Sequence, residues 1–332
     1  MPRPSSVQPN RSAQPADLPE AVPLDAAATS VVMLVNRKAG SGSGLHLVQC
    51  AENLLRGAGL EVSLARGADQ LAETVAATPA GGLRAVVAVG GDGTVGMALN
   101  HTPPGVPLAV LPLGTENLLA KYLKHKARPD RLLELLTRGV LVQLDAGRAD
   151  GRLFTLMISV GFDAEVVRRV HEGRQGNITH LAYVKPVLQS LRTYRYPQVN
   201  VRWEGAEGNC GESHGRWVFG MNLPRYAQGL PIAPRAIGTD GLLDLCVFER
   251  GRLASAIWYL WHLFRRRHHK LPSVSMLHCR RAVLESSSPE PVPYQLDGDP
   301  GGFLPVEVTI EPKRMTCVVS PQVAQQLGFA LP

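Results

Sequence analysis

An apolar run that stops abruptly in a glycine turn constrains the fold of this chain more than any other segment. Residues 84–89 read Arg-Ala-Val-Val-Ala-Val, and residues 90–94 read Gly-Gly-Asp-Gly-Thr. The β-branched run predicts a buried strand, and residues 94–100 are expected to open a helix. Glycines let the backbone approach a ligand closely, and the amides of such a turn and of a helix N-terminus point at an anion. The segment therefore predicts a phosphate-binding turn.

Strands and helices alternate around this turn. Strands are predicted at residues 30–35, 61–65, 84–89 and 107–112. Helices are predicted at residues 45–57, 69–77, 94–100 and in a segment that ends at Tyr122. This alternation is typical of a mainly parallel sheet with helices on both faces, which makes a three-layer α/β domain. Ligands bind such sheets at the carboxyl ends of the strands, where the polar loops 36–44, 90–94 and 114–117 are expected to lie.

After about residue 145 the pattern changes to short β-rich segments separated by proline and glycine. These segments are residues 153–160, 198–203, 216–221, 243–248, 280–285 and 305–310. They predict an antiparallel β-domain, with helices at 181–194 and at 253–264, the second continuing into 265–270. We therefore divide the chain into a disordered, proline-rich tail (1–27), an α/β nucleotide-binding domain (28–147) and a β-domain (148–325).

Composition indicates which partners and which cellular compartment suit the protein. The net charge of +7 favours an anionic partner, such as a nucleotide, a nucleic acid or an acidic membrane face. No apolar run reaches the roughly 18–20 residues that span a bilayer, and the N-terminus lacks the apolar stretch of a secretory signal. The five cysteines are dispersed without metal-ligand spacing, which favours reduced thiols. We therefore expect a cytoplasmic protein.

The glycine turn also resembles a dinucleotide-binding motif. Gly91, Gly93 and Gly96 formally match the G-x-G-x-x-G fingerprint, and Glu116 follows at about the distance of its acidic residue. That fingerprint normally follows the first strand, whereas this match follows the third, and Glu116 lies in a glycine loop of its own. The match therefore fits hydride chemistry poorly.

Asp92 points toward phosphoryl transfer instead. A carboxylate in an anion-binding turn repels phosphate unless a cation or a proton intervenes, and Mg²⁺ carried by a nucleotide would resolve the conflict. Positioning and charge neutralisation supply most of the catalysis in phosphoryl transfer. The chain has neither a Walker-A sequence nor the His-Arg-Asp signature of protein kinases. The two common kinase folds are therefore excluded.

Six collinear motifs resemble the diacylglycerol kinase catalytic-domain family, which includes bacterial lipid kinases and sphingosine kinases and has NAD kinases as more distant relatives. The glycine turn is one of them. The others lie at residues 35–42 (Val-Asn-Arg-Lys-Ala-Gly-Ser-Gly), 113–117 (Leu-Gly-Thr-Glu-Asn), 160–164 (Val-Gly-Phe-Asp-Ala), 240–244 (Asp-Gly-Leu-Leu-Asp) and 296–299 (Leu-Asp-Gly-Asp). The resemblance spans about residues 30–320.

The resemblance implies ATP and Mg²⁺ in a cleft between the α/β domain and an antiparallel β-sandwich, with transfer of the γ-phosphate to a lipid hydroxyl. It implies nucleotide-binding roles for Asn36, Arg37, Gly40, Gly90, Gly91, Gly93, Thr94, Gly114, Thr115, Asn117 and Asp297. It implies metal-binding roles for Asp240, Asp145 and Asp244. Asp299 falls on the position of the base that activates the lipid hydroxyl, and Asp92 is the second catalytic candidate.

Three residues depart from the family pattern. Asp299 stands where glutamate is usual, so its carboxylate reaches less far, and a base must come within about 3 Å of its proton. Met157 stands where we expect asparagine, and Arg37 replaces the usual proline. These departures keep three hypotheses open: a lipid kinase, a kinase that phosphorylates a soluble dinucleotide such as NAD, and a non-catalytic protein that binds nucleotide or lipid.

Several of these residues also have plain structural interpretations. Asp297 and Gly298 form a dipeptide that is frequent in β-turns, and Asp240 and Gly241 form another. Asp145 and Asp163 are the right type of residue to cap or brace the junction between the domains. These interpretations stay open beside the functional ones.

Residues 257–270 combine aromatic side chains with a cluster of Arg, His and Lys. This combination suits a membrane interface, and the alternative is a helix packed on the β-domain with a solvated basic end. A role in nucleic-acid binding is a third alternative that we do not expect. The expected partner is therefore a lipid substrate at a membrane surface, with peripheral membrane contact through 257–270. We leave open whether the chain forms a homodimer.

Overall fold

The computed structural model describes residues 18–36, 43–173, 187, 190, 193–226 and 229–332. Two of the predicted nucleotide-binding residues, Arg37 and Gly40, lie outside these ranges. Most of the helix predicted at residues 181–194 also lies outside them.

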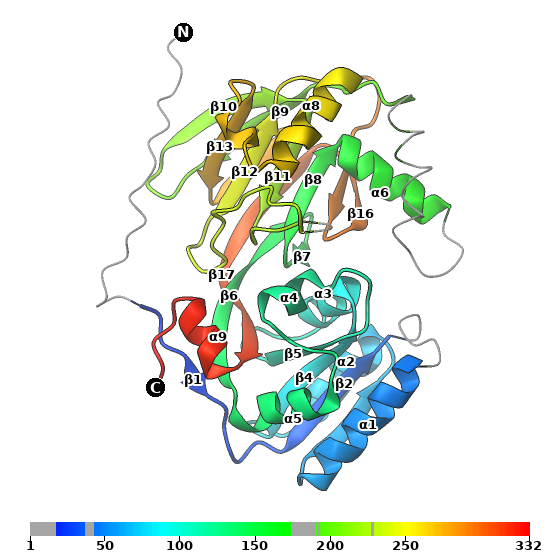
Figure 1. Ribbon diagram of the computed structural model, residues 1–332, viewed down its shortest axis with the longest axis vertical. Helices are drawn as coiled ribbons and strands as arrows, with labels where there is room; N and C mark the ends of the chain where they lie inside the picture. Colours follow the sequence, from blue (N-terminus) through cyan, green and yellow to red (C-terminus); the bar gives the residue numbers. More distant parts are fainter. Residues whose placement is uncertain (1–17, 37–42, 174–186, 188–189, 191–192, 227–228) are drawn as a thin grey trace.

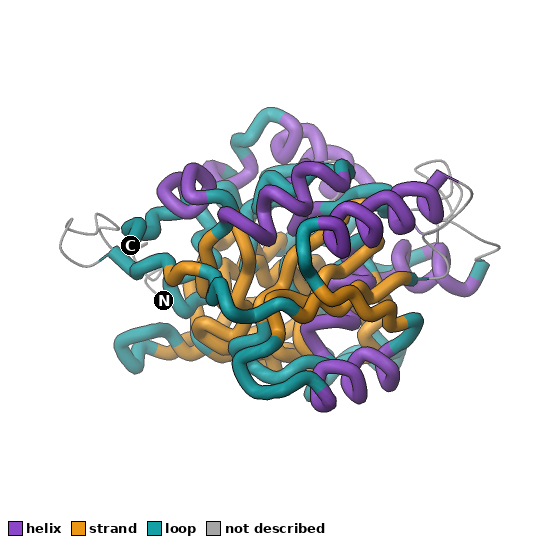
Figure 2. The backbone as a smooth tube through the Cα atoms, turned by 90° about the horizontal axis from the view of Figure 1, so that it is seen from below, coloured by secondary structure: helices purple, strands orange, loops and turns teal. Residues whose placement is uncertain are grey.

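The N-terminal domain is built on a parallel sheet with helices on both faces, as the sequence predicts (Figures 1 and 2). Its strands are β2 (Ser30–Val35), β3 (Glu61–Ala65), β4 (Leu83–Gly90) and β5 (Pro107–Pro112), in the order β3-β2-β4-β5. One face is covered by α1 (Ser43–Gly57) and α5 (Pro129–Arg138). The other face is covered by α2 (Ala68–Ala77), α3 (Asp92–Asn100) and α4 (Leu118–Tyr122). The predicted three-layer α/β domain is confirmed.

The apolar run of β4 is buried because the strand lies between two helical layers. Val86 and Ala88 face the layer of α2, α3 and α4, whereas Val87 and Val89 face the layer of α1 and α5. A strand that is covered on both faces needs an apolar side chain at every position, which a strand with one solvated face does not. This double burial explains the uninterrupted run in the sequence.

The second domain is a β-sandwich. One sheet contains six strands in the order β13-β12-β11-β8-β15-β16. They are β8 (Met157–Gly161), β11 (Trp217–Met221), β12 (Leu243–Phe248), β13 (Val274–Cys279), β15 (Pro293–Leu296) and β16 (Asp299–Phe303). The sheet that packs against it contains β6 (Val140–Ala149), β7 (Arg152–Phe154), β9 (Val199–Glu204), β10 (Cys210–Gly215), β14 (Arg281–Glu285) and β17 (Val306–Val319). The antiparallel β-sandwich is confirmed.

Two long strands, β6 and β17, run through both domains (Figure 1). β17 pairs with β14 of the sandwich at one end and lies parallel to β5 at Thr316 and Cys317 at the other. The pattern 305–310 predicts only the first part of β17, because the register shift between Glu311 and Met315 interrupts the apolar alternation. One sheet therefore continues from the α/β domain into the sandwich.

Both chain ends attach to this shared sheet. β1 (Val22–Pro23) pairs with β6, and the amide of Ala21 donates to the carbonyl of Ala330. α9 (Pro321–Gln326) follows β17 and contacts β6. Residues 18–27 of the segment assigned to the tail therefore contact the folded protein.

Two helices, α6 (Phe162–Glu172) and α8 (Leu253–Phe264), cover the outer face of the six-stranded sheet (Figure 1). Side chains alternate along β11, so that Trp217 and Phe219 point to these helices while Val218 points into the sandwich. α8 has the predicted bounds but ends at Phe264, and a separate 3₁₀ turn, η4, follows at His268–Lys270. The helix therefore does not continue through the basic segment.

Candidate active site

Two of the predicted nucleotide loops pack directly on each other at the carboxyl ends of β4 and β5. A Cβ atom added to Gly114 would lie 2.5 Å from the Cα atom of Gly91, so only glycine fits there. The amide of Leu113 donates to the carbonyl of Gly90 at 2.9 Å. The loops 90–94 and 114–117 therefore form one surface, as their places after neighbouring parallel strands predict.

Asp92 and Asn117 fasten these loops with their side chains. The Asp92 carboxylate accepts hydrogen bonds from the amides of Leu118 (3.0 Å) and Leu119 (3.1 Å), at the start of α4. Burial raises the pKa of Asp92, and these two bonds oppose the shift. The Asn117 side chain pairs with both the amide and the carbonyl of Gly114. Both residues thus hold the shape of the glycine surface.

Thr94 lies beneath the glycine turn. Its side chain is buried, and a Cβ atom on Gly90 would lie 2.2 Å from its hydroxyl oxygen. The side-chain amide of Asn36 donates to that oxygen at 3.4 Å. Asn36 and Thr94 thereby connect the end of β2 to the first turn of α3. Thr115 is exposed on the neighbouring loop.

Asp297 anchors the second half of the site. Its carboxylate accepts hydrogen bonds from the Thr155 amide (2.6 Å), the Thr155 hydroxyl (2.9 Å), and the amides of Leu156 (2.8 Å) and Met157 (2.9 Å). Burial raises its pKa to about 6 despite these four donors. Asp297 and Gly298 both have positive φ and form the two-residue turn between β15 and β16. The turn interpretation of this dipeptide therefore holds.

A buried polar network supports that turn from behind. The side-chain oxygen of Gln295 accepts the amide of Gly298 at 2.7 Å, and its nitrogen donates to Ser159, to Asp163 and to the sulfur of Met157. Ser159 in turn donates to Asp163 at 2.6 Å. Asp163 is thus the brace that one interpretation of the sequence describes, and Met157 supplies a weak acceptor where we expected an amide.

Asp299 faces Gly93 of the glycine turn, and both residues line the pocket between the domains. Its Oδ2 atom lies 3.5 Å from the position that a Cβ atom would take on Gly93. Its Oδ1 atom lies 3.6 Å from Nε2 of His171, and its Oδ2 atom lies 3.8 Å from Nη2 of Arg152. The side chain is 44% exposed, so a ligand can reach it. The structure therefore brings together Gly93 and Asp299, which lie some 200 residues apart in the sequence.

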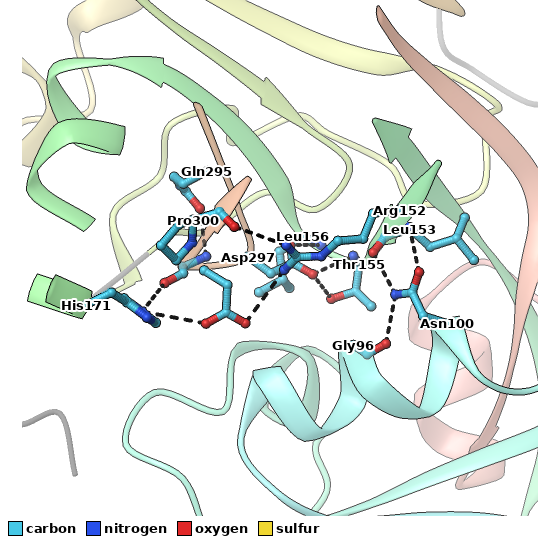
Figure 3. Close-up of polar contacts among 12 residues, drawn as sticks. Gly96, Asn100, Arg152, Leu153, Thr155, Leu156, His171, Gln295, Asp297 and Pro300 are labelled. Carbon is cyan, nitrogen blue, oxygen red and sulfur yellow. Dashed lines mark hydrogen bonds and ion pairs between the residues drawn. The ribbon is translucent and has the colours of Figure 1, made fainter. Parts of the chain in front are cut away.

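Asn100 fixes the distance between these two halves. Its side chain both donates to and accepts from the backbone of Leu153, at 3.0 and 2.8 Å, and so ties the end of α3 to β7 (Figure 3). A pocket of about 610 Å³ lies between the halves. Its lining includes Gly93, Gly96, Arg152, Asp297 and Asp299. Two glycines of α3, Arg152 and the carboxylates of Asp299 and exposed Asp150 thus line a single pocket.

Two family models match successive parts of the chain and agree with this geometry. The model described as the diacylglycerol kinase catalytic domain matches residues 30–149, and the model described as the YegS C-terminal NAD kinase beta sandwich-like domain matches residues 156–319. The chain belongs to the diacylglycerol kinase catalytic-domain family. Its recognition from six motifs is confirmed, and with it a place among lipid kinases.

The chain is similar to proteins named as diacylglycerol kinases and to an uncharacterised protein. A diacylglycerol kinase of Bacillus subtilis is 27% identical over 250 residues, which cover 73% of this chain and 80% of that protein. An uncharacterised protein of Synechocystis is 27% identical over 235 residues, or 69% of this chain, and the match spans only 53% of that longer relative. A crystal structure of a putative diacylglycerol kinase from Bacillus anthracis superposes with a TM-score of 0.68 at 19% identity, covering 90% of this chain and 98% of that one. That last similarity establishes the fold.

The residues proposed for Mg²⁺ divide into two groups. The Asp145 carboxylate accepts the amides of Gly241 (2.7 Å) and Lys313 (2.8 Å). Burial raises the pKa of Tyr122 to about 12, and the nearby charges of Asp145 and Asp240 add to the shift. Asp240 directly precedes Gly241, so the Asp145 carboxylate lies beside the backbone next to Asp240. Asp244 is instead buried beside His278, with 3.6 Å between its Oδ1 and the Nδ1 atom of the histidine.

This arrangement fits Mg²⁺ in part. In the described part of the chain, no group of three or more His, Cys, Asp or Glu side chains is placed to hold a metal. Mg²⁺ keeps several waters and needs only one or two carboxylates, so Asp145 and Asp240 suit it as a pair. Neither Asp145 nor Asp240 lines the pocket between the two halves of the site, so an ion held by this pair would lie outside that pocket.

The sequence did not point to His171, Arg152 or Asn100. His171 lies in the last turn of α6, Arg152 follows the turn between β6 and β7, and Asn100 ends α3. None of them belongs to a motif of glycine or acidic residues that could have marked it. Only the folded chain brings Arg152 and Asn100 to the pocket and His171 to Asp299. Among the described helices, none is long and apolar enough to cross a membrane.

Proposed function

We propose that this protein is an ATP-dependent kinase that transfers the γ-phosphate to the hydroxyl of diacylglycerol or of a related lipid, such as sphingosine or ceramide. The observation that carries the proposal is the position of Asp299, whose Oδ2 atom faces Gly93 at the start of α3. A helix N-terminus that opens with glycines binds phosphate, and a carboxylate opposite it can take a proton from an incoming hydroxyl. The two requirements of the reaction thus meet in one pocket.

The step we propose is a direct displacement. The lipid hydroxyl oxygen forms a bond to the γ-phosphorus while the bond from that phosphorus to the β,γ-bridging oxygen breaks, so that ADP leaves. Asp299 accepts the hydroxyl proton. Asp92 does not take this role in the proposal, because its carboxylate oxygens accept the amides of Leu118 and Leu119. Asp297 likewise spends its oxygens on the segment 155–157.

The remaining groups of the pocket would orient the reactants and balance their charge. The amides of Asp92 and Gly93, which open α3 ahead of the Thr94 amide that donates to the carbonyl of Gly91 at 2.9 Å, suit phosphate oxygens. Arg152 donates to the carbonyl of Pro300 at 3.1 Å and leaves part of its guanidinium toward the pocket. A guanidinium stabilises the charge that spreads over the transferred phosphoryl group.

Asp145 and Asp240 are the residues of this chain that we propose to hold Mg²⁺. The ion would neutralise the charge of these two carboxylates. Because Asp145 also binds the amides of Gly241 and Lys313, this pair would steady the contact between β6, β17 and the loop that precedes β12.

The experiment is transfer of label from ATP to an acceptor. Mixed micelles would contain diacylglycerol, monoacylglycerol, sphingosine or ceramide, and NAD would be offered as a soluble acceptor. Label on one of the lipids supports the proposal. Label on NAD alone would favour the dinucleotide kinase, and tight ATP binding without turnover on any acceptor would favour the non-catalytic protein.

A further inference from the structure

Helix α8 has two apolar faces, and only one of them is packed. Ala256, Tyr259 and Leu263 are at most 2% exposed and contact the outer face of the six-stranded sheet. The ring of Tyr259 packs at a tilt against the ring of Phe248 in β12, with 4.7 Å between the ring centroids. These three residues are spaced as one face of a helix. One face of α8 therefore packs on the sandwich, and the opposite face is not needed for this contact.

The opposite face of α8 is large, aromatic and exposed. We call it the α8 outer face, and it consists of Ile257 (57% exposed), Trp258 (49%), Trp261 (48%) and Phe264 (67%). Trp258 and Trp261 stack on each other with 5.6 Å between centroids. Single exposed apolar residues are ordinary on a protein, whereas a contiguous patch of this kind marks an interaction site.

Positive charge surrounds the α8 outer face. Residues 250–270 contain Arg250, Arg252, Arg265, Arg266, Arg267 and Lys270 and no Asp or Glu. All six of these side chains are exposed, and the Arg265 guanidinium lies 4.5 Å from the ring centroid of Trp261. Among the described residues, no ion pair joins these cations to a carboxylate. The partner of this face must therefore be both apolar and negatively charged.

A membrane surface with anionic lipids meets both requirements. Tryptophan side chains settle at the level of the headgroups, and nearby Arg and Lys bind anionic lipid. A second copy of the chain fits less well, because a two-fold contact through this face would bring the same six cations together. Single-stranded nucleic acid would stack on the tryptophans but would leave Ile257 and Phe264 against a polar backbone.

Helix α6 connects the sheet face that carries α8 to the candidate active site. α6 and α8 cover the same face of the six-stranded sheet (Figure 1), and a chain of aromatic contacts links Phe162 of α6 through Trp217 and Phe248 to Tyr259. The last turn of α6 carries His171, which contacts the turn of Asp299. A bilayer that touches α8 would therefore lie on the side of the sheet from which α6 reaches the site.

We propose that the α8 outer face and the cations around it dock the protein on anionic membranes. This inference deepens the proposed function, because it supplies the way in which a kinase for lipids reaches its substrate. Docking itself does not need nucleotide or turnover, so its test stands apart from the kinase assay.

The test measures how the full chain binds vesicles, with no ATP present. Vesicles of phosphatidylcholine alone are compared with vesicles that contain phosphatidylglycerol and phosphatidylcholine in equal parts. We expect binding to the anionic vesicles, weakened by salt, and about tenfold weaker binding after Trp258→Ala and Trp261→Ala together or after Arg265, Arg266 and Arg267 are changed to Gln. Lipids with brominated acyl chains should quench the tryptophan fluorescence of the wild type. They should not quench the fluorescence of the variant in which Trp258 and Trp261 are both changed to Ala.

Matched controls separate docking from general charge and apolar exposure. Lys126, Arg131 and Arg138 are exposed on the α/β domain, and their change to Gln removes the same charge. Leu54→Ala removes an exposed apolar side chain from α1. Both control proteins should bind anionic vesicles as the wild type does. The variants on α8 alter exposed side chains, so thermal unfolding should confirm that they remain folded.

Four outcomes would overturn the proposal. They are no binding of the wild type to anionic vesicles, equal binding by the α8 variants, concentration-dependent dimers that the tryptophan variants abolish while vesicles stay unbound, and binding to single-stranded DNA in place of vesicles. Phosphorylation of a lipid in detergent micelles distinguishes this failure from that of the kinase proposal. The α8 variants should retain that activity and lose it only on bilayers.

Discussion

The Nε2 atom of His171 lies 3.6 Å from Oδ1 of Asp299 and 3.2 Å from the carbonyl oxygen of Gly298. The last turn of α6 thus touches the carboxylate that faces Gly93. Because Asp297 and Gln295 fix the backbone of this turn from the other side, Asp299 is held between two rigid supports. These neighbours of Asp299 therefore set the position of its short side chain.

The first prediction concerns the proposed base. Asp299→Asn keeps the size of the side chain and removes its ability to accept a proton, so kcat should fall by about 10²–10⁴-fold. The affinity for ATP should change little, because we assign phosphate binding to the first turn of α3. Steady-state kinetics and calorimetric nucleotide binding check the two halves of this statement. Asp130→Asn on the exposed side of α5 is the matched control, and equal activity of both variants would remove Asp299 as the base.

The second prediction concerns the residue that holds this base. His171→Ala should lower kcat by about tenfold and leave KM for ATP nearly unchanged, because the change loosens Asp299 without touching the phosphate-binding amides. His171→Gln keeps a side-chain donor and should recover part of the loss. A rise in KM with unchanged kcat in the alanine variant would instead assign His171 to substrate binding.

The fold and one half of the site follow from local patterns. An apolar run in the sequence predicts each strand of the α/β domain. Because the strands are parallel, the loops after β4 and β5 lie at the same edge of the sheet. Gly91 and Gly114 therefore meet as expected. β17 was predicted too short, because Pro312, Lys313 and Arg314 break the apolar pattern while the strand continues past them.

The roles of the acidic side chains were harder to predict from sequence. A carboxylate between glycines has the same sequence signature whether it binds a ligand or caps backbone amides. Asp92 caps the start of α4, and Asp297 holds the segment 155–157. Both functions depend on elements brought close only by the fold. The same holds for Arg152 and His171, which lie near the two carboxylate oxygens of Asp299 and come from β7 and α6.

The third prediction distinguishes the roles of two glycines in the surface formed by loops 90–94 and 114–117. Gly93→Ala would place a Cβ atom 3.5 Å from Asp299, which is ordinary contact, so the protein should stay folded. The methyl group would occupy the space proposed for phosphate, and KM for ATP should rise by about tenfold. Gly114→Ala would bring a Cβ atom to 2.5 Å from the Cα atom of Gly91, and should cost about 1–3 kcal/mol of stability.

Urea unfolding and ATP kinetics of both variants check this prediction. Gly57→Ala at the end of α1 is the control, because a Cβ atom there has no neighbour within 4 Å. Its stability should stay the same or rise by up to about 1 kcal/mol. Loss of stability in Gly93→Ala, or none in Gly114→Ala, would contradict the assignment of these two positions.

The fourth prediction concerns the pH dependence of stability and His125, whose ring bonds to both β5 and β17. Its Nδ1 atom accepts the amide of Val110 in β5 at 3.2 Å, and its Nε2 atom lies 2.9 Å from the carbonyl oxygen of Val318 in β17. Both bonds are satisfied by the neutral ring, which accepts at Nδ1 and donates at Nε2. Burial lowers the pKa of His125 to about 4.

A histidine whose pKa is lowered by folding makes the protein sensitive to acid. Between the unfolded pKa of 6.5 and the folded value of about 4, the unfolded chain binds more protons, so stability falls as the pH falls. The full loss should be about 3 kcal/mol once the pH is below about 4. His125→Gln offers the same acceptor and donor without titrating, and its stability should depend less on pH across this window. Urea unfolding of both proteins checks this, with exposed His46→Gln as the control, and parallel acid profiles of wild type and His125→Gln would show that His125 is not the group responsible.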